Sequence, residues 1–218
     1  MIDFKDYKRV KEIKESCYKG TRIILGNKKR SLIDKMISIL KSNGFQEIQI
    51  PIIQYQEIFK NKVGVENNNL MFNFNDRGNR EICLAPEYTA VIQNLSKTYF
   101  KDKKNVKVFY VAECFRGEKP QAGRYRQFTQ LGVEIINPTE IGMLPLLASD
   151  LISTITKEFD INFDVTRGLD YYKEGKGFEI VCEQLGSSKQ VCGGGEYDGG
   201  IGFAIGIDRL LETLKYEL

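Results

Sequence analysis

Apolar residues follow two spacings along this chain, and each spacing predicts one kind of element. Leucine, isoleucine and methionine recur three and four positions apart over residues 31–43, the period of an amphipathic helix, and Gly44 follows as a stop signal. We predict helices over residues 31–43, 88–99, 139–159 and 208–215. Pro145 lies inside the third of these segments and should break or kink it.

Alternation of polar and apolar residues predicts the strands. The expected strand segments are residues 45–53, a hairpin over 72–84, residues 106–115, the hairpin that follows them, and several glycine-jointed segments over 163–206. Pro51 favours an edge or interface position for the first strand. Consecutive strands between flanking helices predict an α+β fold around a mostly antiparallel sheet. No repeat or linker divides the chain, so we expect a single domain over residues 1–218.

One predicted strand, the second strand of the hairpin in residues 115–134, has two chemically different faces. Side chains alternate along a strand, so Leu131 and Val133 share an ordinary core face. The other face carries Phe128, Gln130 and Glu134, with a glycine at position 132 that leaves space for something to approach. Alternation by itself is typical of a half-solvated sheet. An aromatic ring, an amide and a carboxylate in one row also suit a ligand that is part ring, part phosphate and part amino acid.

Composition narrows the class of protein. The content of 42% hydrophobic and 28% charged residues is ordinary for a globular protein, and the net charge of +3 does not demand a nucleic-acid partner. No apolar run approaches the roughly 20 residues that cross a membrane, and the N-terminus lacks a signal-peptide pattern. We therefore expect a cytoplasmic protein with no membrane partner. Five scattered cysteines favour reduced thiols over a disulfide framework or a zinc site.

Residues 115–134 carry the sequence F-R-G-E-K-P-Q-A-G-R-Y-R-Q-F-T-Q-L-G-V-E. This segment resembles motif 2 of class II aminoacyl-tRNA synthetases, in the form found in histidyl-tRNA synthetases. Residues 85–89 are similar to the R-P-E-x-T segment of that family, 167–172 to its R-G-L-D-Y-Y signature, and 202–209 to motif 3. Residues 44–51 resemble motif 1, which forms the dimer interface in the family, so we expect a homodimer.

The resemblance implies an enzyme that activates an amino acid, histidine in this family, with ATP and Mg²⁺ to give an aminoacyl-adenylate. The implied catalytic residues are Arg116, Arg167 and Arg209. The implied ATP-binding residues are Arg116, Glu118, Arg124, Phe128 and Arg209. The implied amino-acid-binding residues are Glu87, Thr89, Gln130, Glu134, Arg167, Tyr171 and Tyr172. No protein metal ligand is expected, because Mg²⁺ would bridge the phosphates.

The chemistry of adenylation is compatible with an unusual feature of the composition, the absence of histidine. This absence excludes Ser-His-Asp and Cys-His catalysis and any imidazole general base. The nucleophile of adenylation is the substrate carboxylate, which is already ionised at neutral pH. Such an enzyme needs positioning and neutralisation of charge, and a guanidinium supplies forked donors that match phosphate oxygens.

The sequence also departs from the family pattern. Ala85 stands where the family has arginine, Tyr88 replaces a small residue, and Glu196 replaces an arginine in the G-G-G-x-Y-D segment. A wider pocket or an altered charge could therefore select an amino acid other than histidine. Only residues 135–166 separate the motif 2 segment, which ends at Glu134, from the R-G-L-D-Y-Y segment, which begins at Arg167, whereas the family has a longer insertion there. The chain ends soon after Arg209, so we expect no anticodon-binding domain.

These departures leave three functions open. The first is a reduced synthetase core whose acceptor is a tRNA acceptor stem, a carrier protein or a small molecule. The second is a non-catalytic histidine sensor similar to the synthetase-like regulatory subunit of ATP phosphoribosyltransferase in histidine biosynthesis. Retention of Arg116, Arg124 and Arg209 argues against this second function. The third is one chain of a split synthetase, with the missing domains supplied by another protein.

Overall fold

A seven-stranded sheet forms the centre of the computed structural model, which describes residues 17–60, 62–64, 68–121, 123–140, 144–166, 169–186 and 189–214. Its strands are β1 (Gln46–Glu47), β5 (Val106–Phe115), β6 (Gln127–Ile136), β7 (Asp160–Val165), β8 (Tyr172–Val181), β9 (Gln190–Tyr197) and β10 (Gly200–Gly206). They lie in the order β1-β5-β6-β10-β9-β8-β7. Only β1 and β5 pair in parallel among these described strands, so the expected α+β fold with a mostly antiparallel sheet is confirmed.

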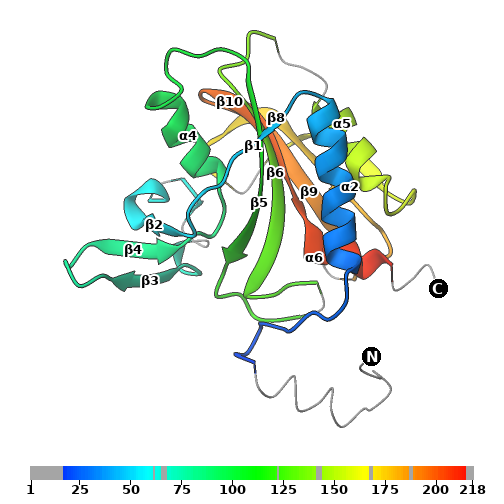
Figure 1. Cartoon of the computed structure of the whole chain (residues 1–218), viewed down its shortest axis with the longest axis horizontal. Helices are drawn as coiled ribbons and strands as arrows, with labels where there is room; N and C mark the ends of the chain where they lie inside the picture. Colours follow the sequence, from blue (N-terminus) through cyan, green and yellow to red (C-terminus); the bar gives the residue numbers. More distant parts are fainter. Residues whose placement is uncertain are drawn as a thin grey trace.

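Helices cover both faces of this sheet (Figure 1). One face packs against α2 (Lys28–Ser42), α5 (Leu144–Ile152) and α6 (Ile207–Thr213). The other face packs against α4 (Thr89–Lys97). Beside α4 lies a smaller sheet of β2 (Ile53–Tyr55), β4 (Glu81–Leu84) and β3 (Phe72–Asn75). The short helix η1 (Gln56–Ile58) follows β2 in the chain. Within the described ranges, no helix combines the length and the apolar character needed to cross a bilayer.

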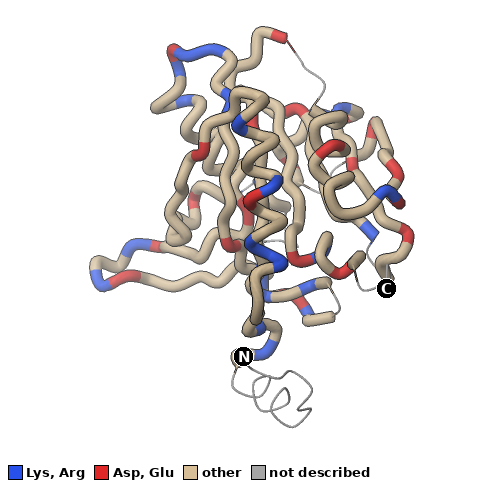
Figure 2. Tube along the Cα trace, turned by 45° about the vertical axis from the view of Figure 1, so that its right-hand side comes forward, with Lys and Arg blue, Asp and Glu red and all other residues tan. Residues whose placement is uncertain are grey.

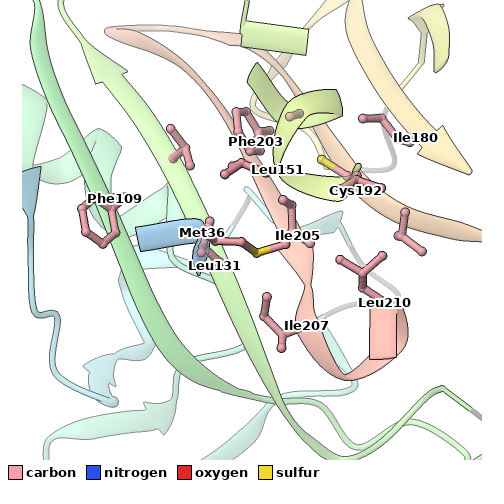
Figure 3. Packing of buried hydrophobic residues seen from close by; sticks show 14 of the residues in the cluster. Met36, Phe109, Leu131, Leu151, Ile180, Cys192, Phe203, Ile205, Ile207 and Leu210 are labelled. Carbon is pink, nitrogen blue, oxygen red and sulfur yellow. The ribbon is translucent and has the colours of Figure 1, made fainter. Parts of the chain in front are cut away.

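The larger core lies between the sheet and α2, α5 and α6 (Figure 3). Leu131 and Val133 of β6 are fully buried there, which confirms the predicted core face of this strand. Met36 of α2 and Leu151 of α5 are equally buried against them. Burying a side chain of this size contributes about 1.5–3 kcal/mol. The core thus fixes which way β6 faces, and its alternate residues are turned toward the opposite side of the sheet.

Several predicted boundaries differ from the structure. The segment 45–53 is not one strand, because only residues 46–47 pair with β5 and the chain joins the smaller sheet at residue 53. Pro51 has no N–H for a ladder bond and lies between these two pairings. The helix expected over 139–159 is described only over Leu144–Ile152, and residues 153–155 form a turn before strand β7 begins at residue 160. The hairpin over 72–84 and the stop at Gly44, whose φ is 80°, are confirmed.

Candidate active site

A cavity of about 430 Å³ opens beside the centre of the sheet. Its walls come from β6, β9 and β10, from the first residues of α4 and α6, and from the connection between β5 and β6. Phe128 and Gln130 line it, and in β6 they alternate with the buried residues of the core face. Segments more than a hundred residues apart in the sequence therefore meet around one hollow.

This cavity brings together ten of the twelve residues for which the sequence predicts a role. They are Glu87, Thr89, Arg116, Glu118, Arg124, Phe128, Gln130, Tyr171, Tyr172 and Arg209. Glu134 is fully buried and contacts the cavity-lining Thr89. Arg167 lies outside the described residues. The grouping agrees with a common site, and the role of each residue stays a prediction.

Three arginines line one part of the cavity. The Arg116 Nε donates to the carbonyl oxygen of Pro86 at 2.9 Å, and its guanidinium carbon lies 5.2 Å from the centre of the Phe128 ring. Arg209 donates through Nε to the carbonyl of Gly123 at 3.3 Å. Arg124 forms an ion pair of 3.6 Å with Glu118. Backbone and carboxylate oxygens thus hold the guanidinium groups at the wall of the cavity.

The electrostatics of this part favour an anionic ligand. Burial lowers the pKa of Arg209 below its ordinary value, and the positive charge of Arg124 lowers it further. The nearby charge of Arg116 acts in the same direction, while Glu118 opposes it. A phosphate group would reduce the repulsion between these cations, and guanidinium groups bind phosphate with forked hydrogen bonds.

A buried carboxylate lies in another part of the cavity, at the start of α4. Glu87 accepts hydrogen bonds from the backbone N–H of Thr89 at 2.7 Å and of Ala90 at 3.1 Å. The Tyr171 hydroxyl also donates to it, at 3.1 Å. Burial raises the pKa of Glu87, and these hydrogen bonds counteract the rise. The site therefore offers acceptor oxygens, suited to an ammonium group, within the same cavity as the arginines.

Glu134 lies deeper than Glu87. It is fully buried, and its two carboxyl oxygens accept from the Thr89 hydroxyl at 2.9 Å and from the Tyr197 hydroxyl at 2.7 Å. Burial raises the pKa of Glu134 to about 8, although both hydrogen bonds favour the charged form. A Cβ at Gly202 on the adjacent strand would lie 1.6 Å from one of these oxygens, so only glycine fits there. Burial thus favours the neutral form of the Glu134 carboxyl, and the hydrogen bonds from Thr89 and Tyr197 favour its charged form.

The structure corrects the interpretation of Gly132. The space above this glycine does not admit a ligand, because the Tyr110 ring of the neighbouring strand occupies it. A Cβ at position 132 would lie 2.0 Å from Cζ of Tyr110. The Tyr110 hydroxyl is buried and has no hydrogen-bond partner among the described residues. Sequence reasoning missed Tyr110 and Tyr197, although Tyr197 stands in the noted glycine-rich segment.

The three glycines of that segment, residues 193–195, lie in strand β9. Gly193 lines the cavity. A Cβ at Gly194 would lie 2.4 Å from the carbonyl oxygen of Gly202, and one at Gly195 would lie 2.8 Å from that of Lys176. Close packing of neighbouring strands therefore accounts for two of the three glycines.

The three residues that depart from the family pattern do not line the cavity. Ala85 and Tyr88 are fully buried, and the Tyr88 hydroxyl donates to the carbonyl of Glu113 at 2.8 Å. The ring of Tyr88 packs against Tyr110 with 5.2 Å between their centres. Neither these residues nor Glu196 line the cavity. Their effect on a bound amino acid would have to be indirect.

The Gln130 side chain has one of its polar atoms already engaged. The Cys114 thiol donates to its Oε1, with 3.1 Å between sulfur and oxygen. Burial raises the pKa of Cys114, so this thiol keeps its proton. The amide oxygen is the atom of Gln130 that could accept from a substrate amino group, and it already accepts from the Cys114 thiol.

The mostly antiparallel sheet, the two-faced β5–β6 hairpin and the final helix α6 together define the catalytic-core fold of class II aminoacyl-tRNA synthetases. The crystal structure of apo S. aureus histidyl-tRNA synthetase shares this fold, with a TM-score of 0.73 and 26% identity over 93% of this chain and 70% of that one. Residues 26–143, more than half of the chain, match the family model described as histidyl-tRNA synthetase. The chain belongs to the histidyl-tRNA synthetase family.

Two curated relatives are both called histidine–tRNA ligase. The protein from Clostridioides difficile is 29% identical over 297 aligned positions, covering 85% of this chain and 70% of the relative. This alignment is longer than the chain, so the relative carries segments without a counterpart here. The protein from Methanococcus vannielii is 42% identical over 151 positions, which cover 66% of this chain and only 36% of the relative.

A further solved structure shows only a shared fold. It is described as an ATP phosphoribosyltransferase regulatory subunit/histidyl-tRNA synthetase from Bacillus halodurans, and it superposes with a TM-score of 0.72 at 17% identity. The match covers 89% of this chain and 82% of that one. At this identity, the similarity does not distinguish an enzyme from a regulator.

Proposed function

We propose that this chain binds ATP and histidine and joins them into histidyl-adenylate, as the catalytic core of a histidine–tRNA ligase. The observation that carries the proposal is the pairing of opposite chemistries in one cavity. Arg116, Arg124 and Arg209 present cations to it, while Glu87 presents carboxylate oxygens. The curated relatives are histidine–tRNA ligases, which supports the same reaction here.

The reaction requires the two substrates to meet between these two parts of the cavity. One oxygen of the histidine carboxylate attacks the α-phosphorus of ATP, a new P–O bond forms, and the bond to the β-phosphate oxygen breaks to release pyrophosphate. Arg116 would hold the α-phosphate and Arg209 the far end of the triphosphate, with Phe128 against adenine. Fixed cations stabilise the charge that develops on phosphate oxygens without reorganising. Arg167 would neutralise charge near the attacking carboxylate, and its placement lies outside the described residues.

The amino-acid part of the site would recognise histidine through its two polar ends. Glu87, Thr89 and Gln130 would hold the α-amino group, and Tyr171 would support Glu87, to which it donates. Glu134 and Tyr172 would contact the imidazole. A buried acid with a pKa near neutrality can accept a hydrogen bond from an imidazole N–H or donate one to a bare ring nitrogen.

Mg²⁺ would arrive with ATP and supply neutralisation of the phosphate oxygens. Among the residues that the structure describes, no three histidine, cysteine, aspartate or glutamate side chains are grouped as metal ligands. Glu118 lines the cavity and pairs with Arg124, so it would lie near an ion carried by phosphates bound at that arginine. This arrangement fits an ion held mainly by substrate oxygens and water.

ATP–pyrophosphate exchange with each of the twenty amino acids tests the proposal. We expect exchange that depends on histidine, and a loss of about a hundredfold or more in Arg116→Ala because one fixed cation is removed. Arg80→Ala is the matched control, since Arg80 is an exposed arginine in the outer hairpin, where it pairs with Asp76. Absence of exchange with every amino acid would overturn the proposal. The acceptor, which we propose to be the 3′ end of a tRNA, is tested separately by transfer from the adenylate.

The alternative is a histidine sensor without catalysis. The fold shared with the Bacillus halodurans protein is compatible with it. The retained arginines at the cavity favour the enzyme, since a sensor has no need to bind a triphosphate. Calorimetry separates the two functions, because a sensor would bind histidine and give no heat with ATP. Co-purification with an anticodon-binding protein would support the further possibility of a split synthetase.

A further inference from the structure

A charged cluster lies next to the cavity but outside its wall, where the segment before α2 meets α6 and the β5–β6 connection. Its centre is Arg22, which does not line the cavity. The Arg22 guanidinium donates to Asp208 Oδ1 at 2.5 Å, to Glu212 Oε1 at 3.3 Å and to the Tyr125 hydroxyl at 2.7 Å. It also stacks on the Tyr125 ring, 3.8 Å from its centre. Figure 2 shows residues of both charges at this end of the molecule, below α2.

The partners of Arg22 belong to the two segments that carry the proposed ATP-binding arginines. Asp208 directly precedes Arg209 in α6, and Tyr125 directly follows Arg124. The Asp208 side chain is only 4% exposed. Its second oxygen accepts from the backbone N–H of Thr129 in β6 at 2.5 Å. One guanidinium therefore connects α6, 186 to 190 positions further along the sequence, to the β5–β6 connection, 103 positions further along.

The backbone around Arg22 is held against the same connection. The Gly20 carbonyl accepts from the Arg126 backbone N–H at 2.7 Å. The Tyr18 hydroxyl accepts from the Arg126 guanidinium at the same distance. Gly20 has a φ of 88°, and a Cβ there would lie 2.8 Å from side-chain carbons of Arg126 and Pro120. Residues 18, 20 and 22 therefore each contact the β5–β6 connection. We call residues 18–22 the strap.

We propose that the strap, through Arg22, is a positioning device that holds Arg124 and Arg209 in place for the triphosphate. The inference rests on the proposed function, because it assigns the purpose of the strap to ATP binding. The two arginines repel one another when no anion lies between them. This repulsion acts against the direct bonds between α6 and the connection, which run from Arg209 Nε to the Gly123 carbonyl at 3.3 Å and from the Tyr125 hydroxyl to Glu212 at 2.9 Å. Arg22 opposes separation of the two segments because it binds the acidic residues of α6 and the tyrosine of the connection at once.

Steady-state exchange kinetics of Arg22→Ala test this role. We expect the KM for ATP to rise about tenfold or more, since small displacements of positioning groups have large effects. The KM for histidine should change by less than about twofold, because Glu87 and Glu134 are held by other contacts. Arg22→Lys keeps the charge but not the forked geometry, so it should fall between the wild type and Arg22→Ala. Arg80→Ala is again the matched control.

Hydrogen exchange of the ligand-free protein gives a second readout that does not require catalysis. In Arg22→Ala the amides of residues 123–126 and 207–212 should exchange faster, while those of α2 and β8 stay protected. If the wild type shows no ATP–pyrophosphate exchange, the proposed function fails, and this measurement still decides whether the strap holds the two segments. An unchanged KM for ATP in active Arg22 variants, or unchanged protection of both segments, would overturn the inference. A lower melting temperature with an unchanged KM would mark Arg22 as purely structural and would also overturn it.

Discussion

Glu134 gives the sharpest prediction about the ligand-free protein, because its carboxyl is fully buried and burial raises its pKa from 4.5 to about 8. Between these two values the folded protein keeps a proton that the unfolded chain has lost. Stability must therefore fall as the pH rises through this window. Each unit of pKa difference is worth about 1.36 kcal/mol, so the loss is on the order of 5 kcal/mol across the whole window and about 3 kcal/mol between pH 5.5 and pH 7.5.

Replacing Glu134 by glutamine removes this titration while keeping a side chain of similar size. Urea unfolding at a series of pH values should show that the difference in unfolding free energy between wild type and Glu134→Gln changes by about 3 kcal/mol over that range, with the wild type losing stability. Glu57→Gln, at an exposed carboxyl, is the matched control and should leave the pH profile of the wild type unchanged. Parallel profiles for the wild type and Glu134→Gln would refute the reasoning, since they would show that the Glu134 carboxyl titrates alike in both states.

Three further predictions concern the sheet, the cavity and the outer face. Gly132→Ala should lower the unfolding free energy by about 1–3 kcal/mol or more, because the new methyl group would clash with the Tyr110 ring. The control is Gly186→Ala, since a Cβ at Gly186 would have nothing within 4 Å. Equal effects of the two substitutions would contradict the packing argument. Arg209→Ala should weaken ATP binding in calorimetry by about tenfold or more while histidine affinity stays the same, because the guanidinium is proposed to bind the triphosphate and not the amino acid. A parallel loss of both affinities would contradict this division of the cavity. Ile53→Asp should convert the expected homodimer to a monomer in sedimentation, because Ile53 is 55% exposed and lines an apolar groove near Pro51. A wild type that is already monomeric would exclude this interface.

The central hairpin could be predicted from the sequence because its signal is local. Strands β5 and β6 are ten residues long each and adjacent in the sequence, and Leu131 and Val133 alternate with the polar residues of β6, so the core face of this strand follows from the period. The segment around Pro51 could not be predicted in the same way. It alternates as a strand does, yet its N- and C-terminal parts join different sheets, and that choice depends on β5 and β4, which lie 30 or more residues away.

The candidate site could likewise be predicted from the sequence only in part. Residues in the motif segments were found because their chemistry is unusual at fixed spacing. Tyr110 was missed, and Gly132 misinterpreted, because the ring that fills the space comes from the neighbouring strand and its register is invisible in the sequence. Arg22 was missed because its segment shows neither period, and its partners lie 103 to 190 positions further along.

The central claim is that one cavity holds a triphosphate and an amino acid at its two ends. A crystal structure of the protein with Mg²⁺, histidine and a non-hydrolysable ATP analogue tests it most directly. We predict adenine against Phe128, phosphate oxygens within hydrogen-bond distance of Arg116 and Arg209, and the imidazole within reach of Glu134. Ligand density elsewhere, or phosphates beyond reach of both arginines, would contradict the claim.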